Sequence, residues 1–186
     1  MKKTLLFLHH TGVDSPKPQF DSVNTYHKKK GFPKSKLGFY CGYTYLVETS
    51  GDFVKAREED EMGSHTYVKG KTYNEDGIGV CLAGNGKFTD WQLRVLVALC
   101  SGIVARHDIK PENILNHYDI KRTSCPGRDL AGYVREALGT APEPSWLSFA
   151  SLSLPEKIKR TRAALKRATG NLVKDLQRRL NRLLKP

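Results

Sequence analysis

Residue types that bind zinc in proteins stand at two places in this chain, far apart in the sequence. His117 and Cys125 lie eight positions apart, and a Pro-Gly turn follows the cysteine. The apolar run Leu5–Leu8 leads directly into the pair His9-His10. Two imidazoles and one thiolate make a zinc site that keeps a fourth position open for water. A closed structural site would need a fourth ligand, and the usual Cys-x-x-Cys pairs are absent, so the pattern indicates a hydrolytic zinc centre.

Five segments are expected to form strands, and two of them carry the candidate ligands. Residues 3–9 are apolar almost throughout, which is typical of a central strand that is covered on both faces. The segment 114–117 is expected to be the last strand and to present His117. The remaining strands are predicted at 42–48, near 53–54 and at 77–83.

Three helices are expected to flank these strands, over residues 20–30, from Thr89 onward, and over 128–138. Thr89 followed by Gln92 makes a capping box, which is typical of a helix start. The polar segment 56–76 has little periodicity and is expected to be a long loop over the site. The predicted fold class is α/β: a single domain with a central mixed β-sheet flanked by helices, followed by a basic helical tail.

The net charge of +12 is concentrated at the carboxyl end of the chain. Residues 156–186 contain eleven basic and two acidic side chains, so nine of the excess positive charges lie there. The length of 186 residues suits one domain with an appendage. We therefore expect a domain over 1–140, a linker rich in proline and serine over 141–155, and a basic amphipathic tail over 156–186.

Apolar residues of the tail fall on roughly one helical face, with cations around them. We expect this helix to lie on anionic lipid or lipopolysaccharide. Two other interpretations stay open: non-specific binding of an anionic polymer or nucleic acid, and packing on the domain or on a second copy. No aromatic residues stand between the cations, so no specific nucleic acid is expected. The proposed contact residues are Arg160, Lys166, Arg167, Lys174, Arg178, Arg179 and Arg182.

The first residues of the chain, two lysines followed by a short apolar run, resemble the start of a signal peptide. Its apolar run is shorter than the roughly 7–15 residues that such a signal needs, and it continues into His9. We therefore expect a buried first strand and no signal peptide, and no stretch approaches the ~20 apolar residues of a membrane span. Cys81 and Cys100 are expected to be small buried residues rather than halves of disulfides; Cys41 has no assigned role.

Seven landmarks between residues 2 and 138 occur in the order and spacing of one enzyme family. The chain resembles the zinc-dependent N-acetylmuramoyl-L-alanine amidases, a family that includes phage lysis amidases and peptidoglycan recognition proteins. Each landmark alone is weakly specific, but the seven in order are strongly so. They are Phe7 to Thr11, Tyr26 to Phe32, Gly42 to Val47, Gly63-Ser64-His65, Asn74, Gly77 to Gly84 and His117 to Gly127.

The resemblance implies a set of zinc ligands. Zinc would be held by His9, His117 and Cys125. His9 is preferred to His10 because the first histidine of the pair binds in the family, and because neighbours on a strand point to opposite faces. His10 would lie behind the ligands as a supporting partner. Cys125 precedes the helix expected at 128–138, whose positive end would favour the thiolate.

The resemblance also implies catalytic and substrate-binding residues. Tyr43 would act as an acid/base or oxyanion donor. Thr123 stands where some phage enzymes have lysine and the recognition proteins have threonine; its hydroxyl can donate one hydrogen bond but supplies no positive charge. His65 would line the substrate groove, and Asn74 would hydrogen-bond the stem peptide. His27 is interpreted as structural.

These residues predict a Zn²⁺-dependent hydrolase that cleaves the amide between N-acetylmuramic acid and L-alanine in peptidoglycan. We expect a monomeric phage or prophage lysis enzyme, an endolysin, made in the host cytoplasm and acting on the cell wall after release. One alternative is a non-catalytic peptidoglycan-binding module, although that group commonly lacks the cysteine ligand. The other is a cytoplasmic amidase that recycles muropeptides, against which the basic tail argues.

Overall fold

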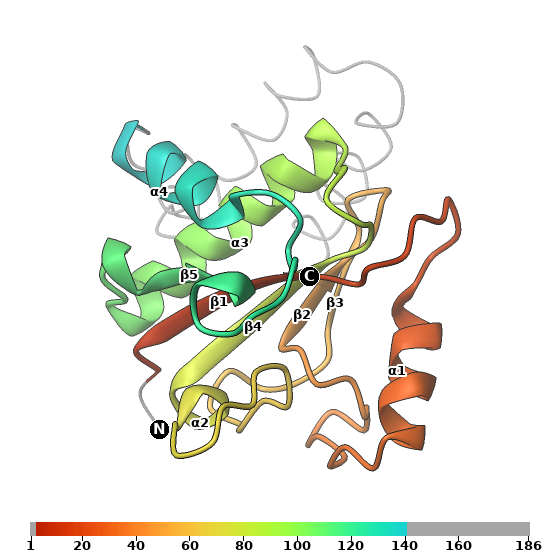
Figure 1. The fold of residues 1–186 in the computed structure, drawn as a ribbon. Helices are drawn as coiled ribbons and strands as arrows, with labels where there is room; N and C mark the ends of the chain where they lie inside the picture. Colours follow the sequence, from red (N-terminus) through yellow and green to blue (C-terminus); the bar gives the residue numbers. More distant parts are fainter. Residues whose placement is uncertain (1–2, 141–186) are drawn as a thin grey trace, which may run out of the picture. The chain divides into compact units, whose positions relative to one another are not determined.

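A five-stranded mixed sheet, in the order β3-β2-β4-β1-β5, forms the centre of the part of the chain that the computed structural model describes, residues 3–140 (Figure 1). Strand β1 lies between β4 and β5 and runs parallel to both. Strand β2 is parallel to β4, and the edge strand β3 is antiparallel to β2. The strands are β1 (Leu5–His10), β2 (Tyr45–Val47), β3 (Phe53–Lys55), β4 (Gly77–Leu82) and β5 (Ile114–Asn116).

Helices cover both faces of the sheet, as the predicted fold class requires. The longest, α3, begins at the predicted capping box: the Thr89 hydroxyl accepts the Gln92 N–H at 3.1 Å, and the Gln92 side chain accepts the Thr89 N–H at 3.0 Å. The helices are α1 (Phe20–Lys29), α2 (Tyr73–Asp76), α3 (Asp90–His107) and α4 (Leu130–Thr140), with two 3₁₀ helices, η1 (Pro111–Asn113) and η2 (His117–Asp119).

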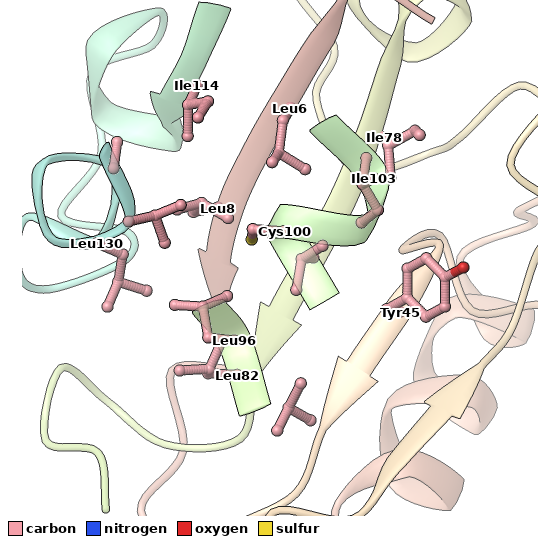
Figure 2. Close-up of a cluster of buried hydrophobic side chains, with 14 of the residues drawn as sticks. Leu6, Leu8, Tyr45, Ile78, Leu82, Leu96, Cys100, Ile103, Ile114 and Leu130 are labelled. Carbon is pink, nitrogen blue, oxygen red and sulfur yellow. The ribbon is translucent and has the colours of Figure 1, made fainter. Parts of the chain in front are cut away.

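Strand alternation on β1 decides which side chains enter the main core. Leu6 and Leu8 pack among Leu96, Cys100 and Ile103 of α3 and Leu130 of α4 (Figure 2). Phe7 and His9, one position out of phase, project from the opposite face. A smaller apolar cluster covers that face, where Phe20 of α1 packs with Leu46. His9 is thus presented away from the larger core, on the side of the loops that precede β2 and β4.

The loop between β3 and β4 is tied to the start of β1 by a buried cation. Lys3 is fully buried, and its ammonium donates to the backbone carbonyls of Glu61, at 2.7 Å, and Glu75. Burial lowers the pKa of Lys3, while nearby carboxylates led by Asp76 oppose that shift. Both ends of the segment 61–75 are therefore held close to the start of β1.

Two boundaries near the candidate ligands differ from the predicted ones. Strand β5 ends at Asn116, and His117 opens η2 instead of ending the strand, because the Asp119 carboxylate accepts the Asn116 N–H at 2.7 Å. Helix α4 begins at Leu130 rather than near residue 128, because the Asn116 amide oxygen accepts the N–H groups of Leu130 and Ala131 at 3.1 and 3.0 Å. Asn116 therefore links the turn that carries His117 to the start of helix α4.

A third difference concerns Tyr43. Strand β2 begins at Tyr45, so Tyr43 lies in the turn before the strand. Cys81 and Cys100 are fully buried, as predicted. The predicted linker 141–155 and tail 156–186, with all seven proposed contact residues, lie outside the described residues. Within residues 3–140, no helix is long and apolar enough to cross a membrane.

Candidate metal centre

The three candidate zinc ligands come together at the end of β1. One ligand atom from each of His9, His117 and Cys125 lies within 4.8 Å of the other two. The Cys125 Sγ is 3.8 Å from Nδ1 of His9, and the two imidazole centroids are 4.6 Å apart. His9 is the last residue but one of the central strand β1, His117 follows the neighbouring strand β5, and Cys125 lies in the loop before α4. Parallel pairing therefore assembles residues that are far apart in the sequence.

The ligand atoms lie slightly farther apart than the ligands of a bound zinc ion would. Bond lengths of about 2.3 Å to sulfur and 2.0–2.1 Å to nitrogen separate tetrahedral ligand atoms by about 3.3–3.6 Å. Two buried ring nitrogens have no hydrogen-bond partner among residues 3–140: Nε2 of His65 and, within the cluster, Nε2 of His117. A buried ring nitrogen without a partner is unusual, and a metal in the cluster would satisfy the one on His117. The donor set of two imidazoles and one thiol suits Zn²⁺, which would draw the three ligand atoms slightly closer together.

Burial of the two imidazoles favours their neutral, metal-binding form. Burial lowers the pKa of His9 well below 6.5, with His65 and His117 as further causes. Burial also lowers the pKa of His117, to which Lys121 contributes. The pKa of the Cys125 thiol is raised to about 11 by burial, so the environment without metal does not favour the thiolate that the sequence led us to expect.

His10 contributes to the centre through its backbone. Its N–H points at the Cys125 Sγ, 3.3 Å away. Its imidazole Nδ1 is 3.2 Å from the carbonyl oxygen of Gly84. The side chain of His10 therefore faces away from the His9 ligand, in keeping with strand alternation, while the backbone N–H orients the sulfur.

Tyr43 and Thr123 lie beside the candidate ligands. Tyr43 is half-buried, with its ring centroid 5.2 Å from that of His9. Burial raises the pKa of Tyr43 well above 10, and the thiols of Cys81 and Cys125 add to this shift. Tyr43 therefore stays protonated and offers an O–H donor. The Thr123 hydroxyl accepts the Cys125 N–H at 3.2 Å and retains its own hydrogen for donation.

His65 and Asn74 lie deeper than a substrate-lining role would suggest. His65 is buried, and its Nδ1 is 3.1 Å from Nε2 of His9. The Asn74 side-chain oxygen accepts the N–H groups of His65 and Thr66, at 3.0 and 2.8 Å. Their contact with substrate stays a prediction. The Thr66 hydroxyl lies 3.4 Å from Nε2 of His9. The sequence analysis does not predict this contact, and the only signal for it in the sequence is that Thr66 follows His65.

His27 fixes the turn that leads into Tyr43. Its Nδ1 accepts the Gly42 N–H at 3.0 Å, and its ring stacks on Phe32 with centroids 4.5 Å apart. A side chain at position 42 would meet the Ser64 carbonyl oxygen at 2.3 Å, so only glycine fits there. The His27 ring thus supports the backbone next to Tyr43, which agrees with the structural interpretation.

A pH-dependent contribution to stability is expected from His27. Burial, assisted by Arg57, lowers its pKa from 6.5 to about 4. Between these values the unfolded chain binds the extra proton, so the free energy of unfolding falls as pH decreases from about 6.5 to 4. His27→Asn keeps an acceptor near Nδ1 but does not titrate. Its melting temperature, measured in chelator by circular dichroism, should fall less steeply over this range than that of the wild type. Parallel profiles for wild type and His27→Asn would contradict the assignment.

The comparison with a family of known proteins identifies the class of enzyme. The family described as N-acetylmuramoyl-L-alanine amidase matches residues 1–128. This is more than half of the chain and includes all three candidate ligands. The chain therefore belongs to the N-acetylmuramoyl-L-alanine amidase family.

Individual relatives agree with this assignment. An endolysin of Enterobacteria phage K11 is 28% identical over 121 residues, which are 61% of this chain and 72% of the relative. The structure of the amidase LysC from Clostridium intestinale URNW matches with a TM-score of 0.62 at 24% identity, covering 75% of this chain and 87% of the other. Bumblebee PGRP-SA matches with a TM-score of 0.60 at 21% identity, covering 77% and 87%. The two structures support the fold and confirm the predicted α/β class with a central mixed sheet flanked by helices.

Proposed function

We propose that this amidase is zinc-dependent and hydrolyses the amide between N-acetylmuramic acid and L-alanine in peptidoglycan. The observation that carries the proposal is the cluster of His9, His117 and Cys125, whose ligand atoms lie within 4.8 Å of one another. Three protein ligands leave one tetrahedral position for water, as in catalytic zinc sites. Family membership supports the reaction class, and the cluster supports a metal bound at this position.

The side chains around the cluster have complementary roles in this proposal. When bound, zinc lowers the pKa of a water molecule and polarises the scissile carbonyl. In this proposal the protonated Tyr43 hydroxyl donates a hydrogen bond to the oxyanion that develops on that carbonyl. Thr123 holds the Cys125 N–H and offers a second, weaker donor. The neutral imidazoles of His9 and His117 remain available as ligands.

We further propose that the enzyme acts in phage lysis. The phage K11 relative is named an endolysin, and the basic residues 156–186 would suit attraction to anionic lipid or lipopolysaccharide at a bacterial envelope. On this view the protein is made in the host cytoplasm, reaches the cell wall after release and works as a monomer. The tail's role is separable from the chemistry, because the family match ends at residue 128.

Removal of the metal tests the proposal directly. Purified peptidoglycan incubated with the protein should release stem peptides that begin at L-alanine, detected by mass spectrometry. A zinc chelator should abolish their release, and added Zn²⁺ should restore it. Release that persists after complete removal of zinc would contradict the metal assignment. Intact sacculi that sediment together with the protein would favour a binding module, and activity confined to soluble fragments would favour a recycling amidase.

A further inference from the structure

We propose that His65 is a positioning residue for the metal centre: its Nδ1 accepts a hydrogen bond from Nε2–H of His9, which fixes the ring and tautomer that present His9 Nδ1 to zinc. This inference rests on the proposed zinc function. It assigns His65 a role behind the ligand, in place of the contact with substrate that the sequence led us to expect.

The two nitrogens of His9 face different partners. Nδ1 lies 3.8 Å from the Cys125 Sγ, within the candidate zinc cluster. Nε2 lies on the far side of the ring, 3.1 Å from Nδ1 of His65 and 3.4 Å from the Thr66 hydroxyl. A metal on Nδ1 leaves the ring proton on Nε2, where His65 can accept it. A ring turned by 180° would place a carbon against His65 and lose this bond, so the contact selects one orientation.

The His65 ring is itself closely packed by its neighbours. A side-chain carbon added to Gly63 would meet the His65 ring at 2.5 Å, and one added to Gly79 would meet it at 2.6 Å. Both positions therefore require glycine for the imidazole to fit. The ring also contacts Phe7, with centroids 5.7 Å apart. The His65 ring therefore packs against the backbones of Gly63 and Gly79 and against the ring of Phe7.

The backbone that carries His65 is fixed from both sides. The Asn74 amide oxygen accepts the N–H groups of His65 and Thr66, and the Asn74 carbonyl accepts the Gly63 N–H at 2.7 Å. The Ser64 N–H donates to the Gly42 carbonyl at 2.9 Å, next to Tyr43. Since Lys3 binds the carbonyls of Glu61 and Glu75, both ends of this loop are also attached to the residue that precedes β1 by two positions. These bonds explain the presence of Asn74 without any contact with substrate.

Partners behind a metal-binding histidine typically change metal affinity by 10–100-fold when they are removed. The mechanism is orientation of the ligand, so the effect should appear in zinc binding itself and should not require turnover. A side chain that restores only the acceptor at the position of Nδ1 should restore affinity. An asparagine oxygen lies close to that position, whereas a glutamine amide extends beyond it.

The test measures zinc affinity of the full chain by competition with a chromophoric chelator at neutral pH. His65→Leu and His65→Asn have nearly the same shape and differ in the acceptor. We expect about 10–100-fold weaker binding for His65→Leu and near-wild-type binding for His65→Asn. His65→Gln, which is polar but too long, should resemble His65→Leu and replaces it if the leucine variant fails to fold. His107→Leu, which alters a histidine bonded to Glu59, should bind zinc normally.

Equal melting temperatures of the variants in excess chelator will show that affinity, and not folding, has changed. Equal zinc affinity for His65→Asn and the two variants without a matching acceptor would overturn the role of His65 while leaving the zinc site intact. A wild-type protein that binds no zinc would overturn the proposed function and this inference together. The two failures are therefore distinguishable.

Discussion

Replacing Cys125 with serine is expected to lower amidase activity by about a thousandfold or more. The reason is loss of the thiolate ligand, since a catalytic metal supplies several kcal/mol of transition-state stabilisation and each 1.36 kcal/mol is a factor of ten in rate. Serine keeps the size of the side chain, so the His10 N–H retains an acceptor close to the original one. The measurement is the rate of release of stem peptides, together with zinc content of the purified protein.

The matched control for this variant is Cys100→Ala. Cys100 is also fully buried, but it lies in the main core between α3 and the sheet (Figure 2). Its replacement should lower the melting temperature modestly and leave zinc content and the rate at permissive temperature unchanged. Full activity of Cys125→Ser with a normal zinc content would contradict the ligand assignment. Loss of activity in both variants would indicate that burial, not metal binding, explains the effect.

The proximity of the three candidate ligands could be predicted from local patterns together with the family resemblance, while their role as zinc ligands stays a prediction. The apolar run before His9 indicates a central strand, and alternation along that strand separates His9 from His10. His117 follows a second apolar strand, and parallel pairing of β5 with β1 brings these strand ends together. The capping box at Thr89 gave the start of α3 for a similarly local reason.

The surroundings of the ligands could not be predicted in the same way. Residues 56–76 have no periodicity, and the conformation of the segment around His65 depends on long-range bonds to Gly42 and Asn74. Those bonds turn His65 inward to His9, so a residue expected in a groove lies buried. Tyr43 was placed in a strand because Gly42 to Val47 reads as one, but the tight approach of Gly42 to Ser64 accompanies a turn there instead.

Replacing Tyr43 with phenylalanine is expected to lower kcat by about 10²–10³-fold, the usual effect of removing one donor to an oxyanion. The ring would remain, so its contact with the His9 imidazole and its packing would be preserved. Because Tyr43 is not a ligand, the variant should bind zinc as tightly as the wild type. KM should change little if the hydroxyl contacts the carbonyl oxygen mainly in the transition state.

Tyr45→Phe is the control that separates this role from the loss of any buried hydroxyl. Tyr45 is only two residues away, but it belongs to the core on the opposite face, and its hydroxyl donates to the Glu59 carboxylate at 2.6 Å. Its replacement should affect stability and leave kcat near the wild-type value. If Tyr43→Phe instead kept its kcat and raised only KM, Tyr43 would be a binding residue, and Thr123 would be left as the oxyanion donor from this chain. Normal zinc affinity in Tyr43→Phe with a depressed kcat would locate the chemistry on the hydroxyl of a ring that lies beside His9, with centroids 5.2 Å apart.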